Sequence, residues 1–107
     1  MKIKNEKGLD MYYKLEGKKI VSCSFEEFSE FFGDIKNRRV AQDYVDKISI
    51  STVFLGIDHN FGGSGTPVLF ETMVFGGEHD EYCQRYHTWQ EAEEGHKEIV
   101  KMVQGFN

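Results

Sequence analysis

Residues 48–57, Ile-Ser-Ile-Ser-Thr-Val-Phe-Leu-Gly-Ile, and residues 67–75, Pro-Val-Leu-Phe-Glu-Thr-Met-Val-Phe, decide the fold of this chain. Both stretches are rich in β-branched and aromatic side chains, which is typical of strands. The first alternates and then becomes apolar on both sides, so we expect a central strand that is covered on both faces. Because only residues 58–66 separate the two stretches, they are expected to pair as an antiparallel hairpin.

Three shorter strands are expected before this pair in the sequence. Residues 11–15 and 19–23 flank the turn signal at Gly17 and predict a hairpin. Residues 39–45 predict an edge strand, and residues 34–39 read as a polar connection.

Two capping boxes mark the starts of helices. Each is a Ser or Thr followed three residues later by Glu, namely Ser24 with Glu27 and Thr88 with Glu91. The first predicts a helix over 25–32 that ends at Gly33, with one aromatic face formed by Phe25, Phe28, Phe31 and Phe32. A helix face with this many aromatic side chains is expected to pack on an apolar surface. The first expectation is the core of the protein itself, and the alternative is a protein partner. The second predicts a helix from 89 to 104 with one apolar stripe, formed by Trp89, Ala92, His96, Ile99, Val100 and Val103.

These elements predict an α+β fold, in which an antiparallel sheet of three to five strands carries two helices. A length of 107 residues favours a single domain, assigned to residues 11–107, after a basic N-terminal extension at residues 1–10. A hydrophobic content of 39% excludes a disordered chain, and no apolar run is long enough to cross a membrane.

Charge and cysteine content limit the partners and the compartment. The net charge is −5, with only three arginines, which makes broad nucleic-acid binding an unfavourable interpretation. Acidic clusters, such as the one at 91–98, are read as solvated helix faces or as a surface for a basic partner. Without a visible secretory signal, Cys23 and Cys83 are expected to be buried free thiols in a cytoplasmic protein.

Three blocks carry a resemblance to a known group. Residues 51–62 read STVFLGIDHNFG, residues 69–77 read LFETMVFGG, and residues 85–96 read RYHTWQEAEEGH. This chain resembles a group of small hypothetical proteins of tailed bacteriophages and prophages, over residues 11 to 101. The resemblance implies a phage or prophage origin and a cytoplasmic location in the infected or lysogenic bacterial host. It implies no activity and transfers no catalytic residue.

The loop after the central strand is the first candidate site. It contains Asp58, His59, Asn60 and Phe61, followed by a glycine-rich stretch. Loop residues held by a rigid sheet often bind ligands or partners. Alternatively, Asp58 and Asn60 cap the turn by accepting bonds from backbone amides, and Phe61 packs back on the core. No helix follows the glycines, so a phosphate-binding loop is not expected.

The buried histidine of the last helix needs a polar partner. His96 lies on the apolar stripe, and Glu71 is the single charge inside residues 67–75. We expect a Glu71–His96 pair, because a buried carboxylate must be paired or protonated. The alternative is a metal site formed by Asp58, His59, Glu71 and His96, although the spacing matches no named metal motif.

A third candidate site is basic and aromatic. Arg38, Arg39, Arg85 and Tyr86 could hold a small anion or a nucleotide through charge and stacking. Alternatively, Arg85 pairs with a nearby carboxylate.

The favoured function is a non-catalytic protein that binds and modulates a host macromolecule, such as a component of a bacterial defence system. The partner would be a host protein or a protein–nucleic acid complex, and no cofactor is expected. The alternatives are a protein that sequesters a small anion or nucleotide and a small metal-dependent enzyme. A homo-oligomer is left open.

Overall fold

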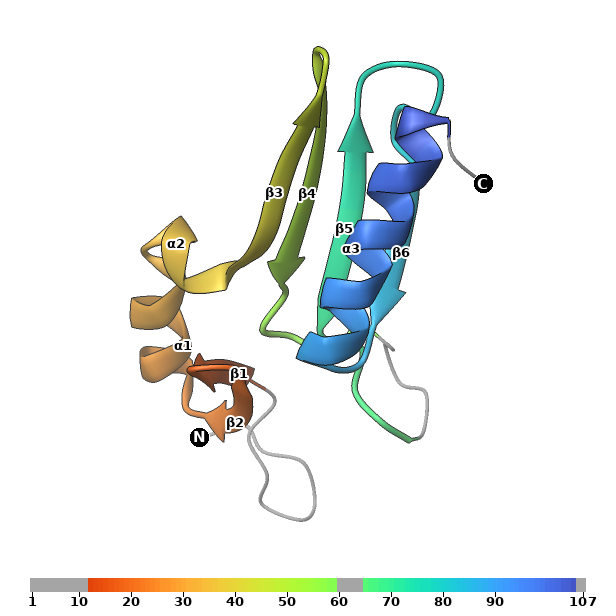
Figure 1. The fold of residues 1–107 in the computed structure, drawn as a ribbon. Coiled ribbons are helices and arrows are strands. Elements are labelled where there is room, and N and C mark those ends of the chain that lie inside the picture. Colours follow the sequence, from red (N-terminus) through yellow and green to blue (C-terminus); the bar gives the residue numbers. More distant parts are fainter. Residues whose placement is uncertain (1–11, 60–64, 106–107) are drawn as a thin grey trace.

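The computed structural model describes residues 12–59 and 65–105 (Figure 1). Its elements, in chain order, are β1 (Tyr12–Glu16), β2 (Lys19–Cys23), α1 (Phe25–Phe32), α2 (Ile35–Arg38), β3 (Arg39–Val45), β4 (Ile48–Phe54), β5 (Phe70–Phe75), β6 (Cys83–Tyr86) and α3 (Trp89–Gln104). β1 and β2 form a two-stranded antiparallel sheet, and β3 to β6 form a four-stranded antiparallel sheet in sequence order. The predicted α+β class is confirmed. The expected N-terminal extension at residues 1–10 lies outside the described residues.

α3 lies along one face of the four-stranded sheet (Figure 1). β4 and β5 turn every second side chain toward this helix, and those side chains are buried: Ile50, Thr52, Phe54, Phe70, Thr72 and Val74. Ala92, His96 and Ile99 of α3 are buried against them. The predicted helical stripe and the predicted alternation of β5 are therefore confirmed.

The opposite face of the sheet differs from the prediction. The central strand was expected to be covered on both sides, but Ser49, Ser51 and Val53 of β4 remain partly exposed. Among the residues that the structure describes, α3 is the helix that packs on the four strands, and it packs on one face only. The expectation of double coverage was wrong because an antiparallel sheet can leave one face to solvent or to a partner.

The β1–β2 hairpin packs at the end of the four-stranded sheet rather than extending it. Tyr13 N–H donates to the carbonyl of Gly56 at 2.8 Å, and Leu15 joins a core cluster with Phe54 and Phe70. Gly56 has φ +76°, and a Cβ there would lie 2.4 Å from the ring of Phe32. Glycine at this position therefore lets the chain turn sharply and lets α1 approach the end of the sheet.

Both predicted capping boxes are present. Ser24 Oγ accepts from the backbone N–H of Glu27, and Thr88 Oγ1 accepts from that of Glu91. α3 ends at Gly105 with φ +90°, which is the left-handed stop expected from the sequence. No helix in the described part of the chain is long and apolar enough to cross a membrane.

Two elements were missed by the sequence analysis. α2 replaces part of the expected polar connection, because Asp34 caps it by accepting from the backbone N–H of Lys36. β6, with the sequence Cys-Gln-Arg-Tyr, has no strong strand pattern of its own and is fixed by pairing with β5. Tertiary pairing decides such short segments more than local propensity does.

Candidate functional site

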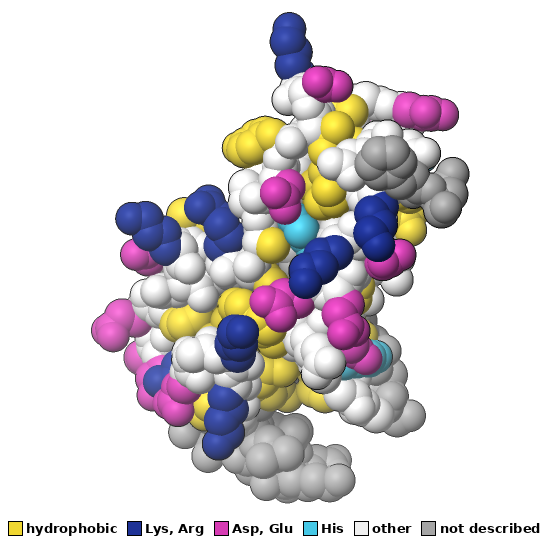
Figure 2. All heavy atoms as spheres, in the orientation of Figure 1, with side chains coloured by type: hydrophobic (Ala, Val, Ile, Leu, Met, Phe, Trp, Pro, Cys, Tyr) yellow, Lys and Arg dark blue, Asp and Glu magenta, His cyan; other side chains and the backbone are white. Residues whose placement is uncertain are grey.

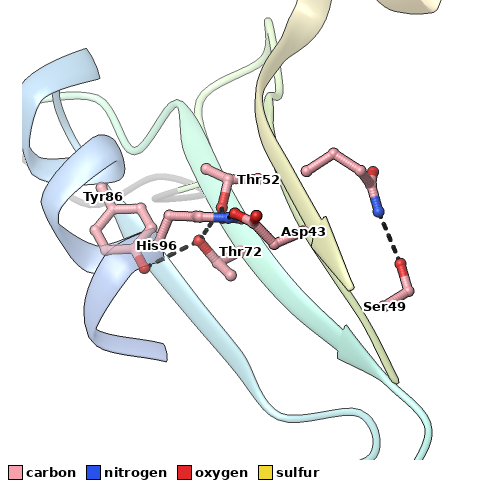
Figure 3. Close-up of polar contacts among 7 residues, drawn as sticks. Asp43, Ser49, Thr52, Thr72, Tyr86 and His96 are labelled. Carbon is pink, nitrogen blue, oxygen red and sulfur yellow. Dashed lines mark hydrogen bonds and ion pairs between the residues drawn. The ribbon is translucent and has the colours of Figure 1, made fainter. Parts of the chain in front are cut away.

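A chain of polar side chains runs through the core between α3 and the sheet. It joins Tyr86, Thr72, Thr52, His96 and Asp43, which come from β6, β5, β4, α3 and β3 (Figure 3). One residue from every strand of the large sheet thus meets the helix. The register explains the alignment, because Thr52 and Thr72 are direct cross-strand partners. Asp43 and Tyr86 lie two residues along their strands from Ala41 and Gln84, which pair with Thr52 and Thr72.

The distances along the chain are short and continuous. Tyr86 Oη donates to Thr72 Oγ1 at 3.0 Å, and Thr72 Oγ1 lies 2.5 Å from Thr52 Oγ1. Thr52 Oγ1 lies 2.6 Å from His96 Nδ1, and His96 Nε2 lies 2.7 Å from Asp43 Oδ2. Every link is within hydrogen-bonding distance.

The hydrogen bonds along these five side chains can all run in the same direction, from Tyr86 to Asp43. One assignment gives every hydroxyl hydrogen an acceptor within the chain: Tyr86 donates to Thr72, Thr72 to Thr52, and Thr52 to His96 Nδ1. The imidazole then carries its hydrogen on Nε2 and donates it to Asp43. Burial raises the pKa of Tyr86, which keeps its hydroxyl a donor.

Substrates cannot reach this chain of hydrogen-bonded side chains. Thr52 and Thr72 are fully buried and His96 is 3% exposed, whereas the side chain of Asp43 is 56% exposed. No reactant can reach the two hydroxyls, so the Asp43–His96–Thr52 order does not act as a nucleophilic triad in this state. Its physical effect is to satisfy buried polar groups and to fix α3 over one position of the sheet.

The predicted Glu71–His96 pair is wrong. Glu71 lies on the face opposite to α3, where its Oε2 accepts from Arg85 Nε at 2.9 Å and from Cys83 Sγ at 3.1 Å. His96 finds Thr52 and Asp43 instead. The alternation along β5 had placed Glu71 on one definite face, but the sequence did not reveal which face α3 covers.

The Glu71 cluster has a chemical consequence for Cys83. Burial, with the hydrogen bond and charge of Glu71, raises the pKa of the Cys83 thiol to about 11. Cys83 is therefore a protonated, half-buried free thiol rather than a nucleophile. Cys23 is buried at the end of β2.

The predicted loop site has a structural role at its described end. Asp58 Oδ1 accepts from the backbone N–H of Val68 at 2.8 Å, and His59 N–H donates to the Val68 carbonyl at 2.9 Å. His59 Nδ1 also lies 2.8 Å from the carbonyl of Ile57. These bonds agree with the turn-capping interpretation of Asp58. Asn60 and Phe61 lie outside the described residues.

The predicted basic and aromatic site is not one pocket. The guanidinium of Arg38 stacks over Phe32, with its Cζ 4.6 Å from the ring centroid, whereas Arg39 is exposed at the start of β3. Arg85 pairs with Glu71, as the alternative interpretation expected, and lies three strands from Arg39, about 14 Å at the usual strand spacing. Tyr86 is 8% exposed and belongs to the buried chain, so its prediction as a binding residue was wrong.

The candidate metal ligands are also separated. Asp58 and His59 follow the end of β4. Glu71 lies on the face of the sheet opposite α3, and His96 lies on the side of α3 that packs on the sheet. Within residues 12–59 and 65–105, no group of three or more His, Cys, Asp or Glu side chains could hold a metal ion.

Two exposed features remain as candidate binding surfaces. The first is an acidic and aromatic ridge on α1. Phe25 is 55% exposed, its ring centroid lies 5.3 Å from that of Tyr12, and the Tyr12 ring lies 4.9 Å from Phe28. No residue of α1 is buried, and its sequence, FEEFSEFF, contains three glutamates and no basic residue. Acidic side chains, with some Lys and Arg side chains among them, lie at the corner of the molecule where α1 lies, and Lys14 pairs with Glu27 at 3.2 Å (Figure 2).

The second is the face of the four-stranded sheet opposite α3, here called the open face. The pairing places its side chains in three rows across the strands: Arg39, Val53, Glu71 and Arg85 in row 1; Gln42, Ser51, Met73 and Cys83 in row 2; and Tyr44, Ser49 and Phe75 in row 3. None of these residues is buried. Sequence analysis missed this surface, although the i, i+2 positions of the strands are its signal.

No protein-family model, curated protein or solved structure matches this chain. The proposals below therefore rest on the geometry and on the sequence resemblance.

Proposed function

We propose that this protein is a non-catalytic binding protein that uses α1 to recognise a basic, partly apolar patch on a partner protein. The observation that carries the proposal is the exposure of Phe25, 55%, on a helix whose charged residues are all acidic. An aromatic side chain at a protein surface is a frequent anchor for a partner. Glutamates around it favour a partner surface rich in Lys or Arg.

The ridge is prepared for binding without rearrangement. The Ser24–Glu27 capping box fixes the first turn of α1, and contacts of Phe32 with Phe28 and Phe54 hold its inner side. A preorganised helix loses less conformational entropy on binding than a flexible segment does. Glu26 and Glu30 are exposed on the same short helix.

Binding is favoured over catalysis because the candidate chemical groups support the fold. His96 is locked in the buried chain, Asp58 caps the turn, and Glu71 holds Arg85 and Cys83. The alternative of a small-anion or nucleotide sink lacks a convergent set of arginines. The resemblance to small phage and prophage proteins supports a partner in the bacterial cytoplasm, and we propose a host macromolecule such as a defence component.

Affinity purification from bacterial cells tests this proposal. The tagged wild-type protein should retain a basic partner, which should dissociate as salt screens the charges. The double variant Phe25→Ala/Glu26→Lys should lose that partner while keeping its thermal unfolding transition, since both side chains are exposed. Glu98→Lys, the same charge change on α3, is the matched control and should retain it. Equal retention by the wild type and the α1 variant would exclude the α1 ridge as the binding surface.

A further inference from the structure

The open face is an unusual surface for a sheet exposed to water. Tyr44 is 70% exposed and Phe75 is 49% exposed, and both flank Ser49 in the same row. Met73 and Val53 add apolar area in the neighbouring rows. Six of the eleven positions hold charged or polar side chains, as expected of a solvent-facing sheet, so the exposed aromatic rings of row 3 are the unusual feature.

The side chains at the centre of the open face are short. Ser49 and Ser51 are small side chains on the central strand β4, whereas the tall aromatic side chains belong to row 3. A second sheet can therefore approach to the spacing of packed sheets, about 10 Å. The shape favours a flat partner over one deeply inserted side chain.

Charge is divided between the two ends of this surface. Row 1 carries Arg39 and Arg85, with one carboxylate, Glu71. Beyond row 3 lie the two turns, which are exposed: Asp46 and Lys47 balance each other in the β3–β4 turn, and Glu78, Asp80 and Glu81 make the β5–β6 turn acidic. One end is basic and the other is acidic, so the surface is complementary to itself when reversed.

We infer that the open face binds a second copy of this chain, face to face, about a two-fold axis that runs across the strands through row 2. Row 1 of one copy then lies over row 3 of the other, and each strand faces its own counterpart. Arg39 meets the partner copy's Tyr44, a cation–π geometry, and Arg85 meets the partner copy's acidic β5–β6 turn. Ser51 and Met73 meet their own counterparts near the axis.

The alternative two-fold axis, along the strands, is disfavoured by charge. It would place Arg39 of one copy against the Arg85–Glu71 pair of the other, and it would set the acidic β5–β6 turn against the β3–β4 turn instead of the basic end. The axis across the strands brings the basic and acidic ends together.

The available area indicates a small interface. Four strands about 4.8 Å apart and seven residues of about 3.3 Å give a flat face of roughly 20 × 25 Å. A standard interface removes about 800 Å² of accessible surface from each partner, which is more than this flat area. The side chains that project from the sheet and the two turns must therefore add to the buried surface. We therefore expect a dimer that exchanges with the monomer at about micromolar concentration.

This inference goes beyond the proposed function and is independent of it. α3 covers the other face of the sheet in each copy (Figure 1). The dimer would therefore be a four-layer sandwich of helix, sheet, sheet and helix. α1 packs on β1 and on Phe54, whose side chain lies on the α3 side of β4, so we expect both acidic ridges to stay accessible in the dimer. Two ridges in one particle would raise the avidity for a repeated partner.

Sedimentation of the full chain over a range of concentrations tests the inference. The wild type should show a monomer–dimer equilibrium. Met73→Lys would place two like charges near the axis and should weaken association at least about tenfold. Gln90→Lys makes the same type of charge addition on exposed α3 and should leave association unchanged.

Cross-linking reports the orientation. In a Cys83→Ser background, Ser51→Cys should be joined to its counterpart by a short bis-maleimide, whereas Gln90→Cys should not. A wild type that stays monomeric at millimolar concentration would overturn the inference, as would equal association of the Met73→Lys variant. Binding of a labelled single-stranded oligonucleotide to the open face of a monomeric protein would assign the surface to nucleic acid instead.

Discussion

Replacing Thr52 and Thr72 with valine, singly and together, tests the buried hydrogen-bond chain. Valine has nearly the same shape as threonine and keeps the β-branched side chain that favours a strand. Both threonines are fully buried, so the substitutions change hydrogen bonding without changing exposed surface. The two hydroxyls bond to each other, and each also bonds to a second group, His96 or Tyr86.

The magnitudes follow from counting orphaned groups. Thr52→Val leaves the Thr72 hydroxyl hydrogen and His96 Nδ1 without partners, at about 1–3 kcal/mol for each buried group, or about 2–6 kcal/mol together. Thr72→Val leaves the Tyr86 hydroxyl without its acceptor and should cost about 1–3 kcal/mol. The double variant orphans only Tyr86 and His96, because the hydroxyls of Thr52 and Thr72 are both gone. It should therefore cost about 1–3 kcal/mol less than the sum of the single variants, which is the cost of one buried group.

Equilibrium unfolding in urea measures all four proteins of this cycle. A domain of this size has a stability of about 5–15 kcal/mol, so each single variant should remain folded. Ser51→Ala is the matched control, because it removes a hydroxyl from the opposite face of the same strand, and it should change stability by less than about 0.5 kcal/mol. Additive costs, within about 0.5 kcal/mol, would refute a continuous chain through the two threonines.

Three other positions offer independent checks. Gly95→Ala should lower the unfolding free energy by about 1–3 kcal/mol, because the new Cβ would lie 2.2 Å from Tyr86 Cε1. This clash outweighs the gain of about 1 kcal/mol in helix propensity. A variant that is more stable than the wild type in urea unfolding would contradict this packing. Cys83 should react with iodoacetamide about 100-fold more slowly at pH 8 than an exposed thiol, because a pKa raised to about 11 leaves less thiolate, and its rate should rise through about pH 11 rather than pH 9. Glu71→Gln should accelerate that reaction, and peptide mass spectrometry would show whether it does. Trp89→Ala should cost about 2–4 kcal/mol by thermal unfolding, since the ring is partly buried against Phe70; a loss below about 1 kcal/mol would place the indole outside the core.

The sequence alone determined the parts of this fold that depend on local spacing. The capping boxes at Ser24 and Thr88 located the starts of α1 and α3, because a side-chain cap acts within three residues. The helical stripe through His96 and the alternation around Glu71 also followed from periodicity, because the backbone geometry fixes which side chains share a face. The α+β class then followed from the order of these elements.

The tertiary structure decided which groups meet. Periodicity showed that His96 would be buried and that Glu71 would share one face with Met73, but it could not say which face of the sheet α3 would cover. A one-residue change in register exchanges the two faces of a strand, so the assignment depends on long-range pairing rather than on local spacing. The pairing of β3 with β4 places Asp43 within reach of His96. The pairing of β5 with β6 places Glu71 beside Arg85 on the open face. Because these partners come from elements far apart in the chain, only the folded sheet determines them.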